Sequence, residues 1–215
     1  MLVKDYMTRH PVMAEPSMSI VEAQRMMAEA GVRHLPVVER GKRLVGLVTR
    51  QTLRIPPTDL ASLNVWEITR FLSNLRLEDV MVKKHSVITI EADIPLEDAA
   101  HVMIQNKIGA LPVLEDGVVV GIITEIDMMA QLTELLGGNV AGVRATIRMP
   151  NRKGELAKIT RAISDRGWAI YASGGVLTPK NPDYWDCVVK LRDVSKEELL
   201  AVLEQIEDQE VIDLR

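Results

Sequence analysis

A short stretch near the middle of the sequence ends an apolar run with a hydroxyl and an acid. The stretch GIITEID spans residues 121–127 and places Thr124 three residues before Asp127. A carboxylate can accept both hydroxyl protons of a ribose in charge-assisted hydrogen bonds, about twice as strong as neutral ones. A threonine hydroxyl beside it donates or accepts as required. The pair predicts recognition of a vicinal diol; the alternative interpretation is that either residue caps the next helix.

A second stretch, GLVTRQT at residues 46–52, has the same pattern with a different ending. Thr49 corresponds to Thr124, but Thr52 stands where the other stretch has Asp127. A neutral hydroxyl is not a bidentate charged acceptor, so a ribose site here should be weaker by about 1.5–3 kcal/mol. We therefore expect one competent ribose site.

The two stretches are the last landmarks of an internal repeat. The copies begin at Asp5 and Asp79, a spacing of about 75 residues, which is too long for a solenoid repeat and suits two copies of a small module. Between these landmarks, the matching pairs are Met7 and Met81, Ala23 and Ala99, Met27 and Met103, and the LPV motifs at Leu35 and Leu111.

Each copy is predicted to form a strand, a helix and two further strands. In the first copy Ser19 and Glu22 have the spacing of a capping box at the start of the helix. Its apolar face comprises Ile20, Ala23, Met27 and Ala30; that of the second copy comprises Leu96, Ala99 and Met103. The last two strands of each copy are separated by a turn, with Gly41 in one and Asp116-Gly117 in the other, which predicts two hairpins.

The ordered motifs D-x-M, apolar helix, h-x-h-P-V and G-h-h-T-x-x-D, present twice, resemble a tandem pair of CBS domains, which sense adenine nucleotides. The resemblance covers roughly residues 2–135. It implies copies at residues 1–56 and 77–136, joined over residues 57–76 by an amphipathic helix with apolar residues from Leu63 to Leu75.

The resemblance also implies a nucleotide site. It comprises Arg33, His34, Ile108, Gly109, Ala110, Leu111, Pro112, Thr124 and Asp127. In that family the phosphates lie near the groove between the copies, so Arg33 and His34 would contact phosphate, while Gly109 and Ala110 leave room for the base. The alternative is that Arg33 and His34 are ordinary solvated residues.

The remainder of the chain begins after a glycine-rich linker at residues 137–142. Residues 143–215 read as strand, helix, strand, strand, helix, strand, the order of the ferredoxin-like split βαβ unit. The first strand alternates through Val143, Ala145, Ile147 and Met149, and the first helix has Leu156, Ile159 and Ile163 on its apolar face. With MPNRKGELAKI at the first turn, this region resembles an ACT domain, and the whole chain is expected to have a mixed α/β, or α+β, fold.

The ACT resemblance implies an effector site at this turn. Its residues are Asn151, Arg152, Lys153, Gly154, Glu155 and Leu156. In the family the turn binds an amino acid at a subunit interface, but Asn151 stands where an acid is common and Arg152 and Lys153 make the turn basic. A carboxylate or another anion would suit it better. The alternative is a helix-start glycine in a domain used only for dimerisation.

Composition excludes several classes of protein. The 215 residues carry a net charge of −4 with acids and bases mixed, so no basic field is available for nucleic acid. A single cysteine, Cys187, and the lack of an apolar membrane-length run predict a cytoplasmic protein without disulfides. The four histidines show no metal-ligand spacing and no catalytic motif is present, so we expect no metal site, no catalytic residue and no enzyme.

We therefore expect a ligand-sensing regulator. Its ligand would be AMP, ADP, ATP, S-adenosylmethionine or a related adenosyl compound, and its ACT effector an amino acid or carboxylate. Chains of this order resemble the acetoin-utilisation accessory proteins of bacteria, which implies a homodimer and an unknown target protein in trans. Two alternatives remain: an enzyme or enzyme subunit that turns over the nucleotide, and a dimerisation module that has lost its ligands.

Overall fold

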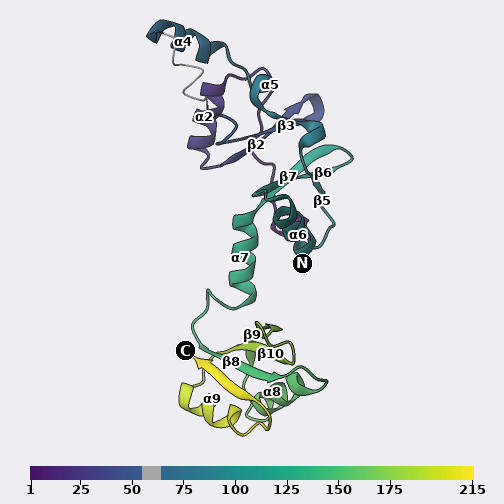
Figure 1. The fold of residues 1–215 in the computed structure, drawn as a ribbon, viewed down its shortest axis with the longest axis vertical. Helices are drawn as coiled ribbons and strands as arrows, with labels where there is room; N and C mark the ends of the chain where they lie inside the picture. The colour runs from purple at the N-terminus through teal and green to yellow at the C-terminus, as the bar shows by residue number, and fades with distance from the viewer. Residues whose placement is uncertain (55–63) are drawn as a thin grey trace. The chain divides into compact units, whose positions relative to one another are not determined.

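The computed structural model describes residues 1–54 and 64–215. By its internal contacts the chain divides into two compact units, Met1–Met128 and Met129–Arg215 (Figure 1). Within these residues, no helix is both long enough and apolar enough to cross a membrane. Each unit has its own sheet and its own buried core residues.

The first unit contains one sheet, which has seven strands among the residues described. Its main path runs β2-β3-β7-β6-β5, with β1 paired to β7 and β4 paired to β3. The strands are β1 (Thr8–Arg9), β2 (His34–Glu39), β3 (Arg43–Thr49), β4 (Val82–Lys83), β5 (Ile90–Glu91), β6 (Ala110–Glu115) and β7 (Val118–Thr124). Both predicted hairpins form, β2 with β3 and β6 with β7, and they meet where Arg43 pairs with Val118.

The longer helices of the two copies form as predicted, and two four-residue helices that were not predicted stand directly before β1 and β4. The helices are α1 (Val3–Tyr6), α2 (Ile20–Glu29), α4 (Val65–Asn74), α5 (Leu77–Val80), α6 (Leu96–Asn106) and α7 (Glu125–Leu135), with short 3-10 turns η1 (Arg40–Lys42) and η2 (Lys84–Ser86). The inter-repeat helix is α4; residues 57–63 of its predicted span, including Leu63, lie outside the described residues. On α2, the Ser19 hydroxyl accepts from the Glu22 amide at 3.2 Å, and Ala30 is an exposed C-cap rather than part of the buried face.

The two copies exchange their first segments. Val3 and Met7 come from the first copy in sequence, yet they pack in the core formed around α6, β6 and β7. Leu77, which begins the second copy, is buried in the core formed around α2, β2 and β3. Each core is completed by the other copy's first residues, so the pair is joined by burial and by the sheet.

The repeated methionine and glycine explain this exchange. Met7 covers Gly121 in β7, and Met81 covers Gly46 in β3; a methyl group built on either glycine would overlap the methionine sulfur. Glycine is needed where another group approaches the backbone this closely. The two D-x-M motifs therefore anchor each leading segment on the opposite copy.

The second unit is a four-stranded antiparallel sheet of order β11-β8-β10-β9 among the residues described. Its elements are β8 (Val143–Pro150), α8 (Glu155–Ser164), β9 (Ile170–Leu177), β10 (Tyr184–Leu191), α9 (Lys196–Leu203) and β11 (Glu210–Leu214). The predicted order of elements is confirmed. The predicted strand face of Val143, Ala145, Ile147 and Met149 is buried with Ile159 and Ile163. Leu156, in the first turn of α8, is exposed and is not part of this core.

Candidate functional site

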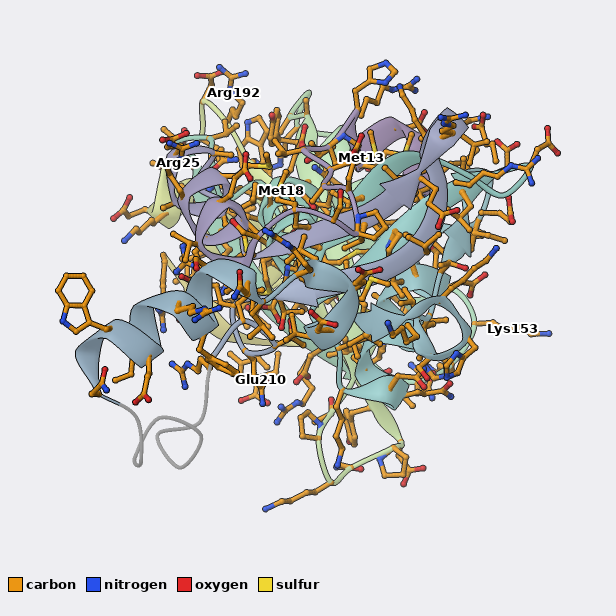
Figure 2. The ribbon with its side chains drawn as sticks, turned by 90° about the horizontal axis from the view of Figure 1, so that it is seen from above. Met13, Met18, Arg25, Lys153, Arg192 and Glu210 are labelled. Carbon is orange, nitrogen blue, oxygen red and sulfur yellow. The ribbon has the colours of Figure 1, made fainter. Side chains whose placement is uncertain are left out.

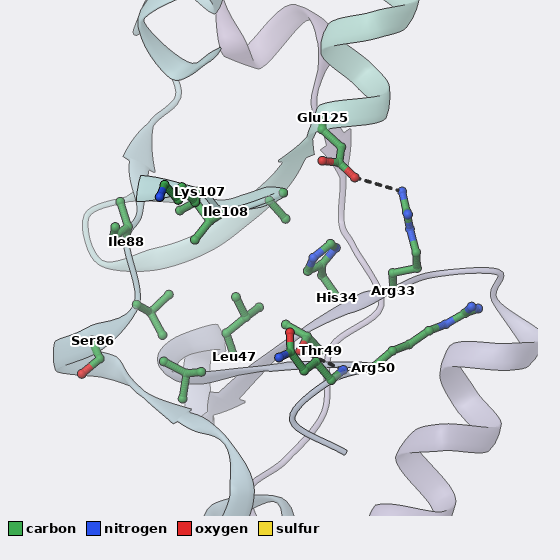
Figure 3. A pocket seen from close by; sticks show the side chains of 15 residues that line it. Arg33, His34, Leu47, Thr49, Arg50, Ser86, Ile88, Lys107, Ile108 and Glu125 are labelled. Atoms are coloured by element: carbon green, nitrogen blue, oxygen red, sulfur yellow. Dashed lines mark hydrogen bonds and ion pairs between the residues drawn. The ribbon is translucent and has the colours of Figure 1, made fainter. Parts of the chain in front are cut away.

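Two pockets form where the copies meet in the first unit. The first, here named the Asp127 pocket, has a volume of about 440 Å³. It is lined by Thr8, His10, Pro11, Val12, Ala30, Gly31, Val32, Arg33, His34, Ile122, Thr124, Ile126 and Asp127. The second, named the Arg50 pocket, has a volume of about 520 Å³. It is lined by Arg33, His34, Leu47, Thr49, Arg50, Gln51, Val82, Ser86, Val87, Ile88, Lys107, Ile108, Gly109, Ala110 and Glu125 (Figure 3).

The carboxylate of Asp127 is fixed by Thr124 at the end of β7. Its Oδ2 accepts from both the amide and the hydroxyl of Thr124, each at 2.8 Å. The Asp127 amide donates back to the Thr124 hydroxyl at 3.4 Å. These reciprocal hydrogen bonds also cap the start of α7. The geometry is therefore compatible with both interpretations of the pair, a helix cap and a ribose-binding site. Within the described residues Oδ1 takes part in no hydrogen bond, which leaves it available to a ligand.

In the first copy, the corresponding residues Thr49 and Thr52 hydrogen bond to each other. The Thr52 hydroxyl accepts from the Thr49 amide at 2.9 Å and donates to the Thr49 carbonyl oxygen at 3.1 Å. It is neutral and does not line the Arg50 pocket, whose lining includes Thr49, Arg50 and Gln51. The first copy therefore reproduces the backbone arrangement without a carboxylate.

Arg33 and His34 line both pockets. The Arg33 guanidinium donates to Glu125 Oε1 at 3.5 Å, with both side chains about half exposed (Figure 3). Such an exposed pair contributes little to stability and can exchange partners. Burial, and then the positive charge of Arg33, lower the pKa of His34 below its ordinary value, while Glu125 acts in the opposite direction.

Glu125 and Arg50 occupy equivalent places in the two copies. The Glu125 amide donates to the Gly109 carbonyl oxygen at 3.0 Å, and the Arg50 amide donates to that of Arg33 at 3.2 Å. A methyl group on Gly109 would lie 3.2 Å from the Glu125 carboxyl carbon. Gly109 therefore gives the Glu125 side chain room at the rim of the Arg50 pocket.

The structure divides the predicted nucleotide residues between the two pockets. Thr124 and Asp127 line the Asp127 pocket, and Ile108, Gly109 and Ala110 line the other one. Leu111 and Pro112 are buried in β6 and line neither.

Sequence reasoning also missed part of the lining. Thr8, His10, Pro11 and Val12 reach the Asp127 pocket because β1 pairs with β7. The repeated D-x-M motif marks this segment in the sequence, but a motif does not reveal which copy its segment joins.

The predicted effector turn in the second unit is internally paired. The Arg152 guanidinium contacts Glu155 Oε1 at 2.7 Å and Asp208 Oδ2 at 2.6 Å. Glu155 is only 3% exposed. Hydrogen bonds from Gln209, then from Arg152 and Lys158, outweigh its burial and lower the pKa of Glu155 to about 2. The positive charge of Arg152 is thus already paired with two carboxylates of the protein.

The other residues of the turn are more open. Asn151 donates to the Pro182 carbonyl oxygen at 3.2 Å, and Lys153 extends away from the ribbon (Figure 2). Gly154 has a φ of 93°, which favours glycine, and nothing lies near a methyl group built on it. Leu156 is 42% exposed. The predicted residues are therefore adjacent, but Lys153 is the basic side chain that remains directed to solvent.

Cys187 is buried in β10, and burial raises the pKa of its thiol to about 11. A thiol is nucleophilic as the thiolate, so this side chain is poorly suited to attack a substrate. In the part of the chain that the structure describes, no three His, Cys, Asp or Glu side chains gather as a metal site would require.

Curated relatives match about three fifths of the chain. An uncharacterized protein from Methanocaldococcus jannaschii is 38% identical over 135 residues, covering 60% of this chain and 46% of the relative. The L-aspartate semialdehyde sulfurtransferase of the same organism is 31% identical over 140 residues, covering 64% of this chain and 23% of the enzyme. The chain therefore spans less than half the length of these two relatives.

Solved structures match a similar share of the chain. A Vibrio cholerae protein assigned to acetoin utilization is 31% identical, with a TM-score of 0.53, covering 65% of this chain and 95% of that protein. A CBS domain pair in complex with 5′-methylthioadenosine and S-adenosyl-L-methionine is 29% identical, with a TM-score of 0.51, covering 65% of this chain and 98% of that one. A third protein, in complex with AMP, is 26% identical with a TM-score of 0.51, covering 62% and 96%.

The sequence also matches the CBS domain family itself, twice, over residues 3–55 and 77–134. The matched segments coincide with the two copies whose strands form the shared sheet. The chain belongs to the CBS domain family.

Proposed function

We propose that this chain is a ligand-sensing regulatory protein whose CBS pair binds an adenosyl compound in the Asp127 pocket. The observation that carries the proposal is the Asp127 carboxylate, held through Oδ2 by Thr124 at the wall of a pocket of about 440 Å³. Support comes from two similar CBS proteins, one solved with adenosyl ligands and the other with AMP.

The pocket offers a partner for each part of such a ligand. The two ribose hydroxyls donate to Asp127, the strongest acceptor in the lining, in charge-assisted bonds. Val12, Val32 and Ile122 provide an apolar wall for the base. Arg33 and His34 face a phosphate in AMP, ADP or ATP. S-adenosylmethionine would use the ribose and base contacts without the phosphate contacts.

Binding can bias the arrangement of the copies. The pocket is lined by the leading segment and Arg33 of the first copy and by the end of β7 in the second, so a ligand stabilises the arrangement that keeps these elements together. The proposed output is a homodimer that acts on a partner protein in trans, with residues 143–215 as an ACT domain that takes a small effector. A role in acetoin utilization is the corresponding pathway proposal.

The test is calorimetric titration and thermal unfolding with AMP, ATP, S-adenosylmethionine and 5′-methylthioadenosine. A ligand at 100 times its dissociation constant stabilises the folded state by about 2.7 kcal/mol. Asp127→Asn should abolish the shift, because the amide loses the charge that accepts the diol. Arg40→Gln is the control for the loss of one charge elsewhere on the chain, since Arg40 lines neither pocket.

Other outcomes identify the alternatives. Unchanged affinity in Asp127→Asn would refute the assignment of the site. Conversion of the bound nucleotide during hours of incubation would indicate an enzyme. If none of the four ligands binds the wild type, a dimerisation module without ligand is the better description.

A further inference from the structure

Four exposed basic side chains gather beside the turn of the first hairpin, on a surface here named the basic patch. They are Lys42, Arg43, Lys84 and His85. The first two lie where η1 leads into β3, and the other two belong to η2, which follows β4 directly. Because β4 pairs with β3 and η2 contacts β3, the two basic segments lie side by side.

The charges of this patch are not neutralised by neighbouring acids. Within residues 1–54 and 64–215, none of the four side chains takes part in a salt bridge. Lys83 differs from them, because its ammonium group donates to the backbone carbonyl oxygen of Glu78. On a chain with a net charge of −4, such a local excess of positive charge attracts an acidic partner.

The internal repeat indicates that the fold does not require these charges. Both residues of each hairpin turn have a positive φ, 74° and 61° at Gly41 and Lys42, and 51° and 77° at Asp116 and Gly117. Left-handed backbone suits glycine and, among the other residues, asparagine and aspartate. Lysine is therefore a disfavoured residue for position 42, and a disfavoured backbone conformation at an exposed cation points to a role outside folding.

Acidic side chains limit the patch on both flanks. On one side lies the turn of the second hairpin, with Asp116, because the two hairpins pair at the start of β3. On the other side Glu15 and Glu39 share a hollow of about 550 Å³ with Arg40. A long nucleic acid would meet these carboxylates with its own phosphates, and a flat anionic membrane favours a broader basic surface. The patch therefore suits a short acidic segment.

We propose that the basic patch is a docking surface for a short acidic segment of a partner protein. Carboxylates of that segment accept charge-assisted hydrogen bonds from Lys42 and Lys84, and Arg43 can hold one carboxylate through two parallel N–H donors. None of the four side chains of the patch lines the Asp127 pocket or the Arg50 pocket. The interaction thus goes beyond the proposed ligand binding and does not depend on it.

Fluorescence anisotropy of a labelled hexaglutamate peptide, titrated with the full chain at low salt, tests the proposal. Arg43→Gln combined with Lys84→Gln should weaken binding at least tenfold. Raising the salt concentration should weaken binding to the wild type as well, because the charges are exposed and are screened. The matched control combines Arg166→Gln with Lys153→Gln, which removes the same two residue types from exposed positions of the second unit and should leave the affinity unchanged.

Further measurements identify the kind of partner. A labelled oligothymidylate and vesicles of phosphatidylserine and phosphatidylcholine should both bind the chain more weakly than hexaglutamate, and a neutral hexaglutamine peptide should not bind. Thermal unfolding shows whether each double variant still folds. Titration with 5′-methylthioadenosine should give the same affinity for the wild type and both double variants.

Several results would overturn the proposal. One is the lack of hexaglutamate binding at low salt and millimolar protein. Another is an equal loss in the two double variants, which would indicate a general charge effect. Tighter binding of the oligonucleotide or of the vesicles through Arg43 and Lys84 would assign the patch to nucleic acid or to a membrane. Binding of 5′-methylthioadenosine is measured separately, so failure of the docking surface leaves the proposed function intact, and the converse also holds.

Discussion

The two pockets of the CBS pair are built from the same repeat but carry different chemistry. In both copies a strand ends in threonine, and the amide of the next residue donates to the carbonyl oxygen of the residue that precedes the first strand of the same hairpin: Glu125 to Gly109, and Arg50 to Arg33. The side chain three residues after the threonine is an aspartate in one copy and a threonine in the other. The repeat therefore supplies the same backbone twice, while the side chain three residues after the threonine differs in charge between the two copies.

The same difference changes the structure after each strand. Asp127 accepts from Thr124 and caps α7, which begins at Glu125. After Thr49 the chain makes a turn closed by Thr52. A charged acceptor at this position thus stabilises a helix start and presents an oxygen to the pocket, whereas the hydroxyl satisfies only local backbone groups.

The most direct test of this difference exchanges the two side chains. Asp127→Thr should remove binding of 5′-methylthioadenosine, and Thr52→Asp in the same chain should restore a diol site in the first copy. A hydrogen bond to a charged group contributes about 1.5–3 kcal/mol, so each exchange should change affinity roughly 10- to 150-fold. Calorimetry measures both the affinity and the number of sites.

Thr52→Asp alone provides the control for this exchange. It should raise the stoichiometry of 5′-methylthioadenosine from one site to two while leaving the first site unaffected. If a second site never appears, the difference between the pockets is not set by this residue, and the first copy must lack another part of the diol site.

A second comparison concerns the glycines under the repeated methionines. A methyl group on Gly46 would meet the Val82 carbonyl oxygen at 2.8 Å as well as Met81, whereas on Gly121 its nearest neighbours are side-chain atoms of Met7. A methionine side chain can move, but β4 backbone can do so only by shifting its pairing with β3. Gly46→Ala should therefore cost about 1–3 kcal/mol, and Gly121→Ala less.

Urea unfolding of the two variants measures this difference. Each serves as the control for the other, because the substitution and its place in the repeat are the same. Gly46→Ala should also weaken ligands of the Arg50 pocket, since Val82 lines that pocket. Equal stability losses would show that the backbone contact at Val82 relaxes without cost.

Much of the fold was readable from the sequence because its signals are local. The helix faces, the Asp116-Gly117 turn and the order of elements in the second unit depend on periodicity and turn chemistry. The left-handed φ values of 51° at Asp116 and 77° at Gly117 match the predicted tight hairpin turn. The exchange of leading segments was not predictable in this way, because either copy could accept Met7 against its equivalent glycine.

The site was readable in part for the same reason. Thr124 and Asp127 are neighbours in sequence, and their contact follows from one turn of backbone. The separation of Gly109 from Asp127 into another pocket depends on how two hairpins meet, which is a long-range property. In the second unit, the pairing of Arg152 with Asp208 likewise joins residues that are far apart in sequence. The sequence of the turn alone therefore could not show that the charge of Arg152 is paired.

A third prediction concerns Arg33, the residue that both pockets share. Arg33→Gln should weaken phosphate-bearing ligands in both pockets and leave 5′-methylthioadenosine unchanged, because that ligand has no phosphate. The guanidinium is about half exposed, so the loss should be about 1 kcal/mol, roughly fivefold in affinity. Titration of AMP into chains that also carry Asp127→Asn or Arg50→Ala tests the two pockets separately. A loss confined to one pocket would show that Arg33 serves that one alone.

The smallest expected effect comes from His34, which also faces both pockets. Burial and Arg33 hold the pKa of His34 below its ordinary value, and Glu125 opposes them. Between the lowered folded pKa and the unfolded value of about 6.5, the unfolded chain binds a proton that the folded chain does not. The contribution of His34 to folding is therefore fully present above about pH 6.5, is lost progressively as the pH falls, and levels off below the folded pKa.

The difference between wild type and His34→Gln isolates this contribution, because the rest of the sequence is the same in both proteins. Urea unfolding from pH 8 to pH 5 should show a decline in wild-type stability that the variant lacks. A phosphate bound beside the imidazole would favour its protonated form and reduce the decline, whereas 5′-methylthioadenosine would not. If both ligands act alike, His34 does not contact phosphate in either pocket, and its place at the shared wall is structural.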